Sequence, residues 1–146
     1  MDLRKSMERF YVGMVINELR MGNGAISQGI THNSLLYLDL IAYTEKCTVS
    51  RLAQMLHIAT SAATLKVKEL EKLGLVSKTQ SEEDKRVYYL TVNEAVRAEY
   101  KVYDQALYAA LDQVERRYRP EQVDMFCDML QIIHQSFCEL EKGEEK

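Results

Sequence analysis

The chain has 146 residues, a formal net charge of −3, one proline, six glycines and no tryptophan. This length is typical of one domain with a core of its own. The small net charge excludes a polycation, and no apolar run reaches the roughly 20 residues that span a bilayer. The first residues lack the apolar core of a signal peptide. We therefore expect a cytoplasmic protein with no membrane partner.

Cysteine and histidine side chains provide no framework for a disulfide or metal site. The sequence has three of each, namely Cys47, Cys127, Cys138, His32, His57 and His134. No two cysteines have CxxC spacing. Cys127 and Cys138 share one face of a predicted helix but lie about 16 Å apart, so we expect buried, inert thiols there. No Ser-His-Asp set or pair of carboxylates indicates catalysis, so we expect no enzyme, no metal ion and no cofactor.

The N-terminal segment, residues 2–20, has apolar residues at steps of four and three, which predict a helix. These residues are Leu3, Met7, Phe10 and Met14. The stretch MGNGAISQG that follows contains three glycines and ends the pattern. A phosphate-binding loop would need a preceding strand and GxGxxG spacing. This stretch is therefore predicted to be a plain loop.

Three shorter helices are predicted next, over residues 32–45, 49–56 and 61–73. Thr31 and Thr48 stand directly before the first two, where a hydroxyl oxygen can accept a hydrogen bond from an unpaired backbone N–H. Gly74 directly follows the third helix, which it can end in the left-handed conformation.

Two β-prone segments, residues 75–79 and 86–92, lie close to five consecutive charged residues, 82–86. This arrangement predicts a β-hairpin with the charged residues at its turn. Such a turn can be merely solvated, or it can be the tip that contacts a charged partner.

Two long helices complete the chain. Asn93 can cap the fifth helix, whose apolar positions are Val96, Tyr100, Tyr103, Leu107 and Leu111. Pro120 suits the first turn of the sixth. Apolar residues of this helix alternate steps of three and four, as in a heptad stripe, at Val123, Phe126, Leu130, Ile133, Phe137 and Leu140.

The predicted fold class is thus mainly α with a small β-hairpin. Three short helices followed by a hairpin make a winged helix-turn-helix module, which we place at about residues 31–92 of a single domain, 1–146. The flanking helices, about 2–20 and 94–141, carry apolar stripes that a module this small cannot cover. They are expected to form the interface of a homodimer, and packing on the module itself is the alternative.

The stretch TVSRLAQMLHIATSAATLKVKELEKLGLVSKTQSEEDKRVYYLTVNEA resembles the MarR family of transcriptional regulators. It has the LA pair of the short helix, the ELEKLGLV end of the recognition helix and the wing signature Asp84-Lys85-Arg86. The resemblance implies a homodimer whose two modules grip successive turns of double-stranded DNA at a palindromic operator. It also implies control by a small molecule, often phenolic, held between dimer helices and module, and in some members by cysteine oxidation or zinc.

One departure from the family pattern lies at the end of the hairpin. A Leu-Thr pair commonly follows eight residues after the wing aspartate, whereas Leu90-Thr91 comes two residues early. A gap-free alignment puts Val92-Asn93 at the expected place. Since asparagine caps a helix as well as threonine does, we keep the gap-free alignment.

Helical geometry divides the predicted recognition helix into two faces. The core face has Ala63, Val67 and Leu70, and the opposite face has Ser61, Leu65, Lys68 and Lys72, with Thr64 at its edge. Helices of this type read base edges with their N-terminal part, where small side chains permit a close approach at Thr60, Ser61 and Ala62. Phosphate contacts, which position the protein without reading sequence, are expected from Lys68 and Lys72.

Leu65 stands where the family commonly has an arginine that contacts DNA. Leucine cannot make the bidentate contact with guanine, which is worth ~1–3 kcal/mol of discrimination. It can pack on a thymine methyl group, or it can be an apolar contact for a protein partner.

The resemblance also gives the charged turn a function. The wing arginine of the family enters the minor groove, whose negative potential attracts arginine, and Arg86 matches that position. Asp84 is expected to hold this guanidinium across the turn, and Lys85 to contact DNA beside it. Glu82 and Glu83 would repel phosphates, so they must point away or weaken binding. Residues 46–90 contain eight Lys or Arg and five Asp or Glu, a net charge of +3. The rest of the chain contains eleven Lys or Arg and seventeen Asp or Glu, a net charge of −6.

We therefore expect a dimeric, sequence-specific DNA-binding transcriptional regulator, a repressor as most of the family are, released by a small-molecule or redox signal. The alternative is an interaction module that binds a protein instead of DNA. A phenolic effector is compatible with tyrosines expected near the family's ligand cleft, Tyr11, Tyr37, Tyr43, Tyr100 and Tyr103. A redox signal would act through Cys47, Cys127 or Cys138.

Overall fold

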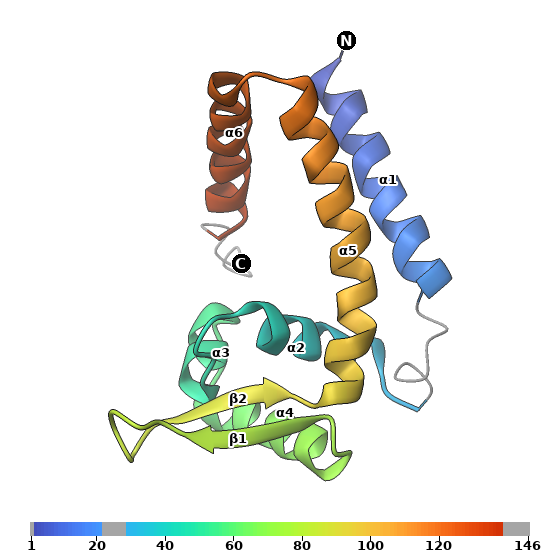
Figure 1. Cartoon of the computed structure of the whole chain (residues 1–146). Helices are drawn as coiled ribbons and strands as arrows, with labels where there is room; N and C mark the ends of the chain where they lie inside the picture. The colour runs from blue at the N-terminus through green and yellow to red at the C-terminus, as the bar shows by residue number, and fades with distance from the viewer. Residues whose placement is uncertain (1, 22–28, 139–146) are drawn as a thin grey trace, which may run out of the picture. The chain divides into compact units, whose positions relative to one another are not determined.

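The computed structural model describes residues 2–21 and 29–138. Within these residues the order of elements is that predicted, four helices, an antiparallel hairpin and two helices (Figure 1). They are α1 Leu3–Met21, α2 His32–Tyr43, α3 Val49–Met55, α4 Thr60–Lys72, β1 Val76–Gln80, β2 Tyr88–Val92, α5 Glu94–Arg117 and α6 Pro120–Cys138. The mainly α fold class with a small hairpin is confirmed. The loop predicted after α1, up to residue 28, lies outside the described residues.

The chain forms two compact units, Met1–Tyr100 and Lys101–Lys146, and α5 begins in the first and ends in the second. The first unit contains the winged helix-turn-helix module, and the second contains most of α5 and all of α6. No helix within the described ranges has the length and apolar character to cross a membrane.

Three helices begin with the side-chain caps that the sequence predicts. Thr31 Oγ1 accepts from the backbone N–H of Ser34 at 3.2 Å, and Thr48 Oγ1 accepts from that of Arg51 at 3.1 Å. Asn93 Oδ1 accepts from Val96 N at 2.8 Å, which supports the gap-free alignment of the hairpin end. Each bond satisfies a backbone donor that helix geometry leaves unpaired. Helix α4 begins without such a cap, after Ala59.

Two helices end in left-handed residues. Gly74, with φ 72°, ends α4 as predicted, and the backbone N–H of Leu75 bonds to Leu70 O at 3.0 Å. His57 ends α3 in the same way with φ 52°, and Ile58 N–H bonds to Ala53 O at 3.0 Å. A side chain is normally unfavourable at such an angle. The short turn between α3 and α4 is therefore formed without the glycine that usually suits it.

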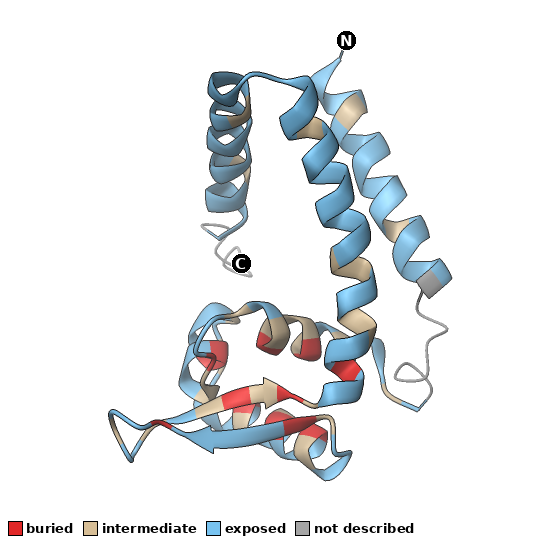
Figure 2. Ribbon diagram, viewed as in Figure 1, coloured by how far each residue is buried: buried red, intermediate tan, exposed pale blue. Residues whose placement is uncertain are grey.

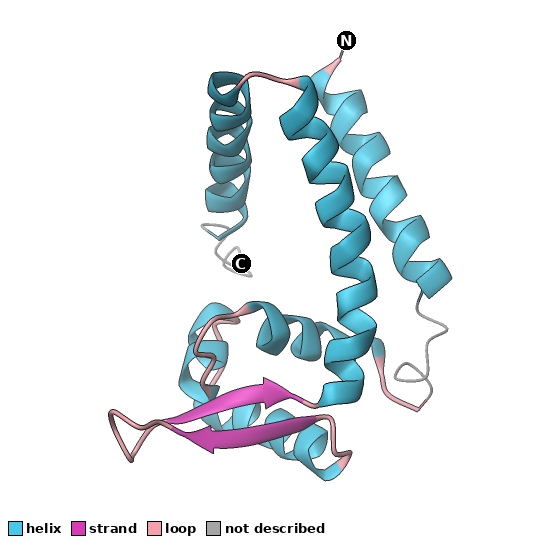
Figure 3. Cartoon of the chain, in the orientation of Figure 1, coloured by secondary structure: helices cyan, strands magenta, loops and turns pink. Residues whose placement is uncertain are grey.

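The two strands pair in register from Val76 opposite Val92 to Gln80 opposite Tyr88. Residues 81–87 form the turn, and Figure 3 shows it as a loop between the two strands. At the other end of the hairpin, Asn93 Nδ2 donates to Gly74 O at 2.7 Å. The asparagine that caps α5 therefore also attaches the end of β2 to the end of α4.

One apolar core holds the module together. Its buried residues come from α2, the loop before α3, α3, α4, both strands and the first turn of α5, namely Leu38, Ile41, Cys47, Leu52, Val67, Leu70, Val76, Leu90, Val92 and Val96. They are among the red positions in Figure 2. Burying one such aliphatic side chain stabilises the fold by about 1.5–3 kcal/mol, so this core fixes the relative positions of the elements that share it.

The other helices are exposed in the single chain (Figure 2). Helix α6 has no buried residue among those described, and its predicted stripe includes Leu130 at 42% and Phe137 at 70% exposure. Leu140 of that stripe lies outside the described residues. Contrary to the expectation of burial, Cys127 and Cys138 are exposed in the single chain, and Cys47 is the buried thiol.

A polar and aromatic contact attaches the start of α5 to α2. The Tyr100 hydroxyl donates to Asp39 Oδ1, and the Tyr100 ring stacks on Tyr43 with centroids 5.6 Å apart. Burial raises the pKa of Asp39, and the hydrogen bond from Tyr100 opposes this rise. Burial also raises the pKa of Tyr100, helped by the Asp39 carboxylate.

The raised pKa of Asp39 predicts a pH-dependent stability. The folded protein keeps the Asp39 proton at a pH where the unfolded chain has released it, so the free energy of unfolding decreases as pH rises from about 4 through the raised pKa. Asparagine still accepts the Tyr100 bond and does not ionise. The free energy of unfolding of Asp39→Asn minus that of wild type should therefore increase from pH 4 to pH 7 in urea titrations.

Tyr100→Phe is the matched control. It removes the hydrogen bond that lowers the pKa of Asp39, so the stability of this variant should depend more steeply on pH than that of wild type. Parallel pH curves for wild type and Asp39→Asn would contradict the role given to this carboxyl group.

Candidate functional site

Helix α4 has one buried and one exposed face, as its sequence predicts. Ala63, Val67 and Leu70 are fully buried in the core. The exposed face presents Ser61, Leu65, Lys68 and Lys72. Leu65 has 70% of its surface exposed, and a single leucine on the solvent face of a helix is common in folded proteins.

The N-terminal turn of α4 is open to approach. Thr60, Ser61 and Ala62 are all exposed there, and their side chains are small. Thr64 is half-buried, and its hydroxyl donates to Thr60 O at 2.7 Å. The proton of this hydroxyl is therefore used within the helix, and its oxygen lone pairs remain to accept a bond.

A polar cluster connects the inner side of α4 to the start of α2. Lys66 Nζ donates to Ser34 Oγ at 3.0 Å and to Glu69 Oε2 at 3.0 Å, and the fully buried Ser34 donates to Glu69 Oε1 at 3.2 Å. The bond from Lys66 holds the pKa of Glu69 below its usual value. Lys66, with only 17% of its side chain exposed, is therefore turned away from the face that carries Lys68.

This cluster is not predicted from the sequence. Lys66 and Glu69 are three residues apart on a helix, a spacing that allows an ion pair and that could have been noticed. Ser34 is thirty-two residues earlier in the chain than Lys66, and no local pattern indicates their contact.

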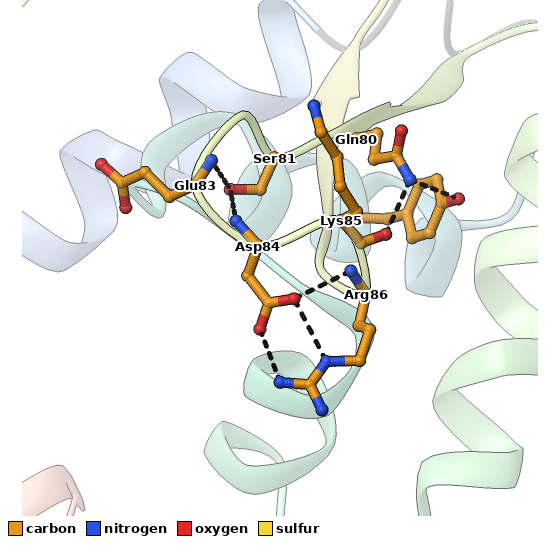
Figure 4. A network of polar contacts seen from close by, with 7 residues as sticks. Gln80, Ser81, Glu83, Asp84, Lys85 and Arg86 are labelled. Atoms are coloured by element: carbon orange, nitrogen blue, oxygen red, sulfur yellow. Dashed lines mark hydrogen bonds and ion pairs between the residues drawn. The ribbon is translucent and has the colours of Figure 1, made fainter.

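The hairpin turn is shaped by two side chains at the end of β1 (Figure 4). Ser81 Oγ accepts from the backbone N–H groups of Glu83 and Asp84, each at 3.3 Å. Gln80 Nε2 donates across the turn to Lys85 O at 2.6 Å and to the Tyr88 hydroxyl at 3.2 Å. These contacts give a turn of seven residues a defined conformation.

Asp84 and Arg86 form a forked ion pair on this turn. Arg86 Nε donates to Asp84 Oδ1 at 3.2 Å, and Arg86 Nη2 to Asp84 Oδ2 at 3.3 Å. The backbone N–H of Arg86 also donates to Asp84 Oδ1 at 2.9 Å. The side-chain bonds from Arg86 lower the pKa of Asp84 most, and the backbone N–H bond from Arg86 lowers it further. The Arg86 side chain is 91% exposed, so its remaining donors face solvent.

Neighbouring charges of the turn point elsewhere. In Figure 4 the Glu83 carboxylate extends away from the Asp84–Arg86 pair, and the Lys85 ammonium extends to the side opposite Arg86. Of the two predicted wing cations, only Arg86 is therefore fixed by the ion pair, and Lys85 presents its charge on another side of the turn.

Exposed cations thus occur on two elements of one unit. Lys68 and Lys72 lie on the outer face of α4, and Lys85 and Arg86 on the hairpin turn. Lys78 is engaged elsewhere, with its ammonium 3.1 Å from Glu71 Oε2. Such a surface, with hydroxyls, an apolar side chain and cations, suits binding of a polyanion better than bond-breaking chemistry.

A second contact missed from the sequence lies on α6. Cys138 Sγ is 3.6 Å from His134 Nε2, four residues earlier on the same helix, and this spacing is visible in the sequence. Two side chains are fewer than the four ligands of a structural zinc site. No cluster of three or more possible metal ligands occurs among the residues that the structure describes.

Comparison with known proteins agrees with this geometry. The sequence model of the MarR family matches residues 30–88, which cover α2 to the start of β2. No curated protein matches the sequence significantly.

Several solved structures share the fold over nearly the whole chain. FabT of Streptococcus pneumoniae, solved in complex with DNA, has a TM-score of 0.63 and 19% identity, covering 94% of this chain and 96% of its own. A putative MarR-family regulator of Listeria monocytogenes, solved with a 26mer DNA, has 0.57 and 17%, covering 100% and 98%. The adhesin competence repressor AdcR of Streptococcus pyogenes has 0.58 and 17%, covering 94% and 99%.

At these identities the structures show a common fold, and the family match assigns the module itself. The winged helix-turn-helix module of residues 30–88 thus matches the MarR family, whose members are transcription regulators and not enzymes.

Proposed function

We propose that this protein is a homodimeric, sequence-specific DNA-binding repressor of transcription. The observation that carries the proposal is the exposed face of α4, together with the Asp84–Arg86 pair on the wing. In this proposal residues 1–146 act as one functional domain, with the module at about 31–92 and dimerisation helices at about 2–20 and 94–141. The similar fold of two regulators solved with DNA supports it.

Helix α4 is proposed to enter the major groove. The small, exposed side chains of Thr60, Ser61 and Ala62 allow its N-terminal turn to approach base edges. Thr64 lies at the edge of this surface, where its hydroxyl oxygen can still accept a bond. Lys68 and Lys72, further along, would meet phosphates on the groove wall.

The wing is proposed to reach an adjacent minor groove. Arg86 would insert its guanidinium there, held by Asp84. Lys85 extends on the opposite side of the turn and would meet a phosphate of the groove edge. Glu83 extends away from the pair, which reduces its repulsion of the backbone that Arg86 approaches.

The first test compares Arg86→Ala with Lys68→Ala on duplexes that wild type selects from a random-sequence pool. Loss of Arg86 should weaken binding most at sites with A·T-rich flanks, because narrow minor grooves attract arginine. Loss of Lys68 should weaken all sites about equally and reduce the salt slope of log K by roughly one unit. Fluorescence anisotropy at four salt concentrations measures both effects.

Lys101→Ala, an exposed lysine outside the proposed surface, is the matched control and should bind like wild type. If all three variants kept the wild-type affinity and salt slope, this surface would not be where the protein binds DNA.

Leu65 is proposed to limit how strongly α4 discriminates among bases. It lies on the outer face between Ser61 and Lys68 and offers no hydrogen-bond donor. Leu65→Arg should raise affinity overall by adding a charge near phosphates. It should also create a preference for G at one position of each half-site, by about 1–3 kcal/mol. Site selection with both proteins at one salt concentration measures the preference.

A gain in affinity without a new base preference would place Leu65 beside phosphate instead of a base. If the folded variant lost DNA binding, Leu65 would be making an apolar contact with DNA, such as with a thymine methyl group. If wild type bound no duplex at all, the alternative function would apply: an interaction module that binds a protein through exposed Leu65.

Dimerisation is proposed to cover the exposed apolar residues of the terminal helices. On α1 these include Phe10, Met14 and Leu3, and on α6 Phe126, Leu130 and Phe137. A monomeric protein rarely exposes such stripes to water, and a second copy can bury them symmetrically.

Leu130→Glu should dissociate the dimer or unfold it, because the interface would bury an unpaired carboxylate. Gln131→Glu adds the same charge one position away, outside the apolar stripe, and should stay dimeric. Sedimentation at micromolar concentration distinguishes one chain of 16.9 kDa from twice that mass. Wild type that sediments only as the 16.9 kDa species would exclude the dimer.

Release from the operator is proposed to follow a small-molecule or redox signal. Tyr43 and Tyr100 stack on each other beside Asp39, a setting that suits an aromatic effector. Cys127 and Cys138 are exposed in the single chain, as an oxidant sensor would require.

A further inference from the structure

We propose that Gln80 and Ser81 are positioning residues of the wing, which determine the preference for flanking sequence by holding Arg86 in its binding orientation. This inference rests on the proposed DNA-binding function and extends it to two side chains that do not contact DNA themselves. The network in Figure 4 is its basis.

Ser81 determines the path of the turn before Arg86. Although it belongs to a surface turn, only 4% of Ser81 is exposed. Its backbone N–H donates to Val87 O at 2.9 Å, and its Oγ accepts from the amides of Glu83 and Asp84. The backbone of Asp84 is held at both ends, since Asp84 O accepts from Val87 N at 2.9 Å. The Asp84 carboxylate therefore starts from a fixed place.

Gln80 acts on the peptide unit that carries Arg86. The carbonyl of that unit belongs to Lys85 and accepts from Gln80 Nε2 at 2.6 Å. Its N–H belongs to Arg86 and donates to Asp84 Oδ1 at 2.9 Å. The unit is therefore held from both sides, which fixes the direction in which the Arg86 side chain leaves the turn.

The two residues act together through Asp84. Ser81 places the Asp84 backbone, Asp84 binds both the amide and the guanidinium of Arg86, and Gln80 fixes the adjoining carbonyl. A turn of seven residues without these bonds would have many conformations, and DNA binding would have to order it. Ordering it in advance removes that penalty from binding.

The experiment measures affinity for two versions of the selected duplex, one with A·T-rich and one with G·C-rich flanks. Ser81→Ala and Gln80→Met should lower affinity for the A·T version by roughly 3- to 10-fold, as expected for losing one or two hydrogen bonds. Affinity for the G·C version should change little. Ser81→Thr keeps the accepting oxygen and should retain the preference.

Ser77→Ala is the matched control. Ser77 lies on the same strand, and its hydroxyl contacts Thr91 Oγ1 across the hairpin at 3.0 Å, away from the turn. The same loss of a hydroxyl there should leave the flank preference unchanged. Thermal melting of each variant verifies that the module remains folded.

A double-mutant cycle separates positioning from general destabilisation. If Ser81 acts through Arg86, then Ser81→Ala should cause little further loss in an Arg86→Ala background. Additive losses, or equal losses on both duplexes, would overturn the inference. The inference would also be overturned if Ser81→Ala and Gln80→Met both kept the flank preference while Arg86→Ala lost it. Wild type without DNA binding, or without flank preference, would instead overturn the proposed function of the module or of its wing.

Discussion

The packing of Ala63, Val67 and Leu70 into the module core is the constraint on which the candidate site depends. Because these three side chains bury one face of α4, only the opposite face can contact a partner. The helical period of 3.6 residues then determines which side chains lie on that exposed face. The same core includes Leu90 and Val92 of β2, so the hairpin is positioned by the same set of contacts as α4. The proposed groove contacts of helix and wing therefore depend on one cluster of apolar side chains.

Polar contacts then determine which cations remain available. Lys66 is bound by Ser34 and Glu69 behind α4, and Lys78 lies against Glu71. Arg86 is paired but remains exposed. The sequence concentrates positive charge between residues 46 and 90. On α4, the cations of this segment that are available to a partner therefore lie on the outer face of the helix. The Lys66 cluster keeps one cation of α4 away from the exposed face. It also connects the start of α2 to the helix proposed to read DNA.

The features predicted correctly from the sequence are local ones. A hydroxyl or amide before a helix caps it within three residues, as at Thr31, Thr48 and Asn93, and a glycine at the end of α4 needs no distant partner. The Ser34–Lys66 bond and the Gln80–Lys85 bond could not be predicted, because each depends on how side chains settle after the chain has folded. Cys127 and Cys138 were expected to be buried and are exposed in the single chain, since a periodic apolar helix does not reveal whether its own chain or a second copy covers it.

The wing shows why geometry has to replace bulk attraction in this protein. Its five consecutive charges comprise three acids and two bases, so at distances beyond the Debye length of about 8 Å a polyanion meets a weakly repulsive tip. Attraction arises only in contact, when the Arg86 guanidinium is closer to the groove than the carboxylates of Glu82 and Glu83. A freely moving turn would average these charges and lose that advantage. In the proposed function, the bonds from Ser81, Asp84 and Gln80 that hold Arg86 in one orientation would therefore allow an acidic turn to bind a negatively charged groove, and they would favour selectivity over speed of association.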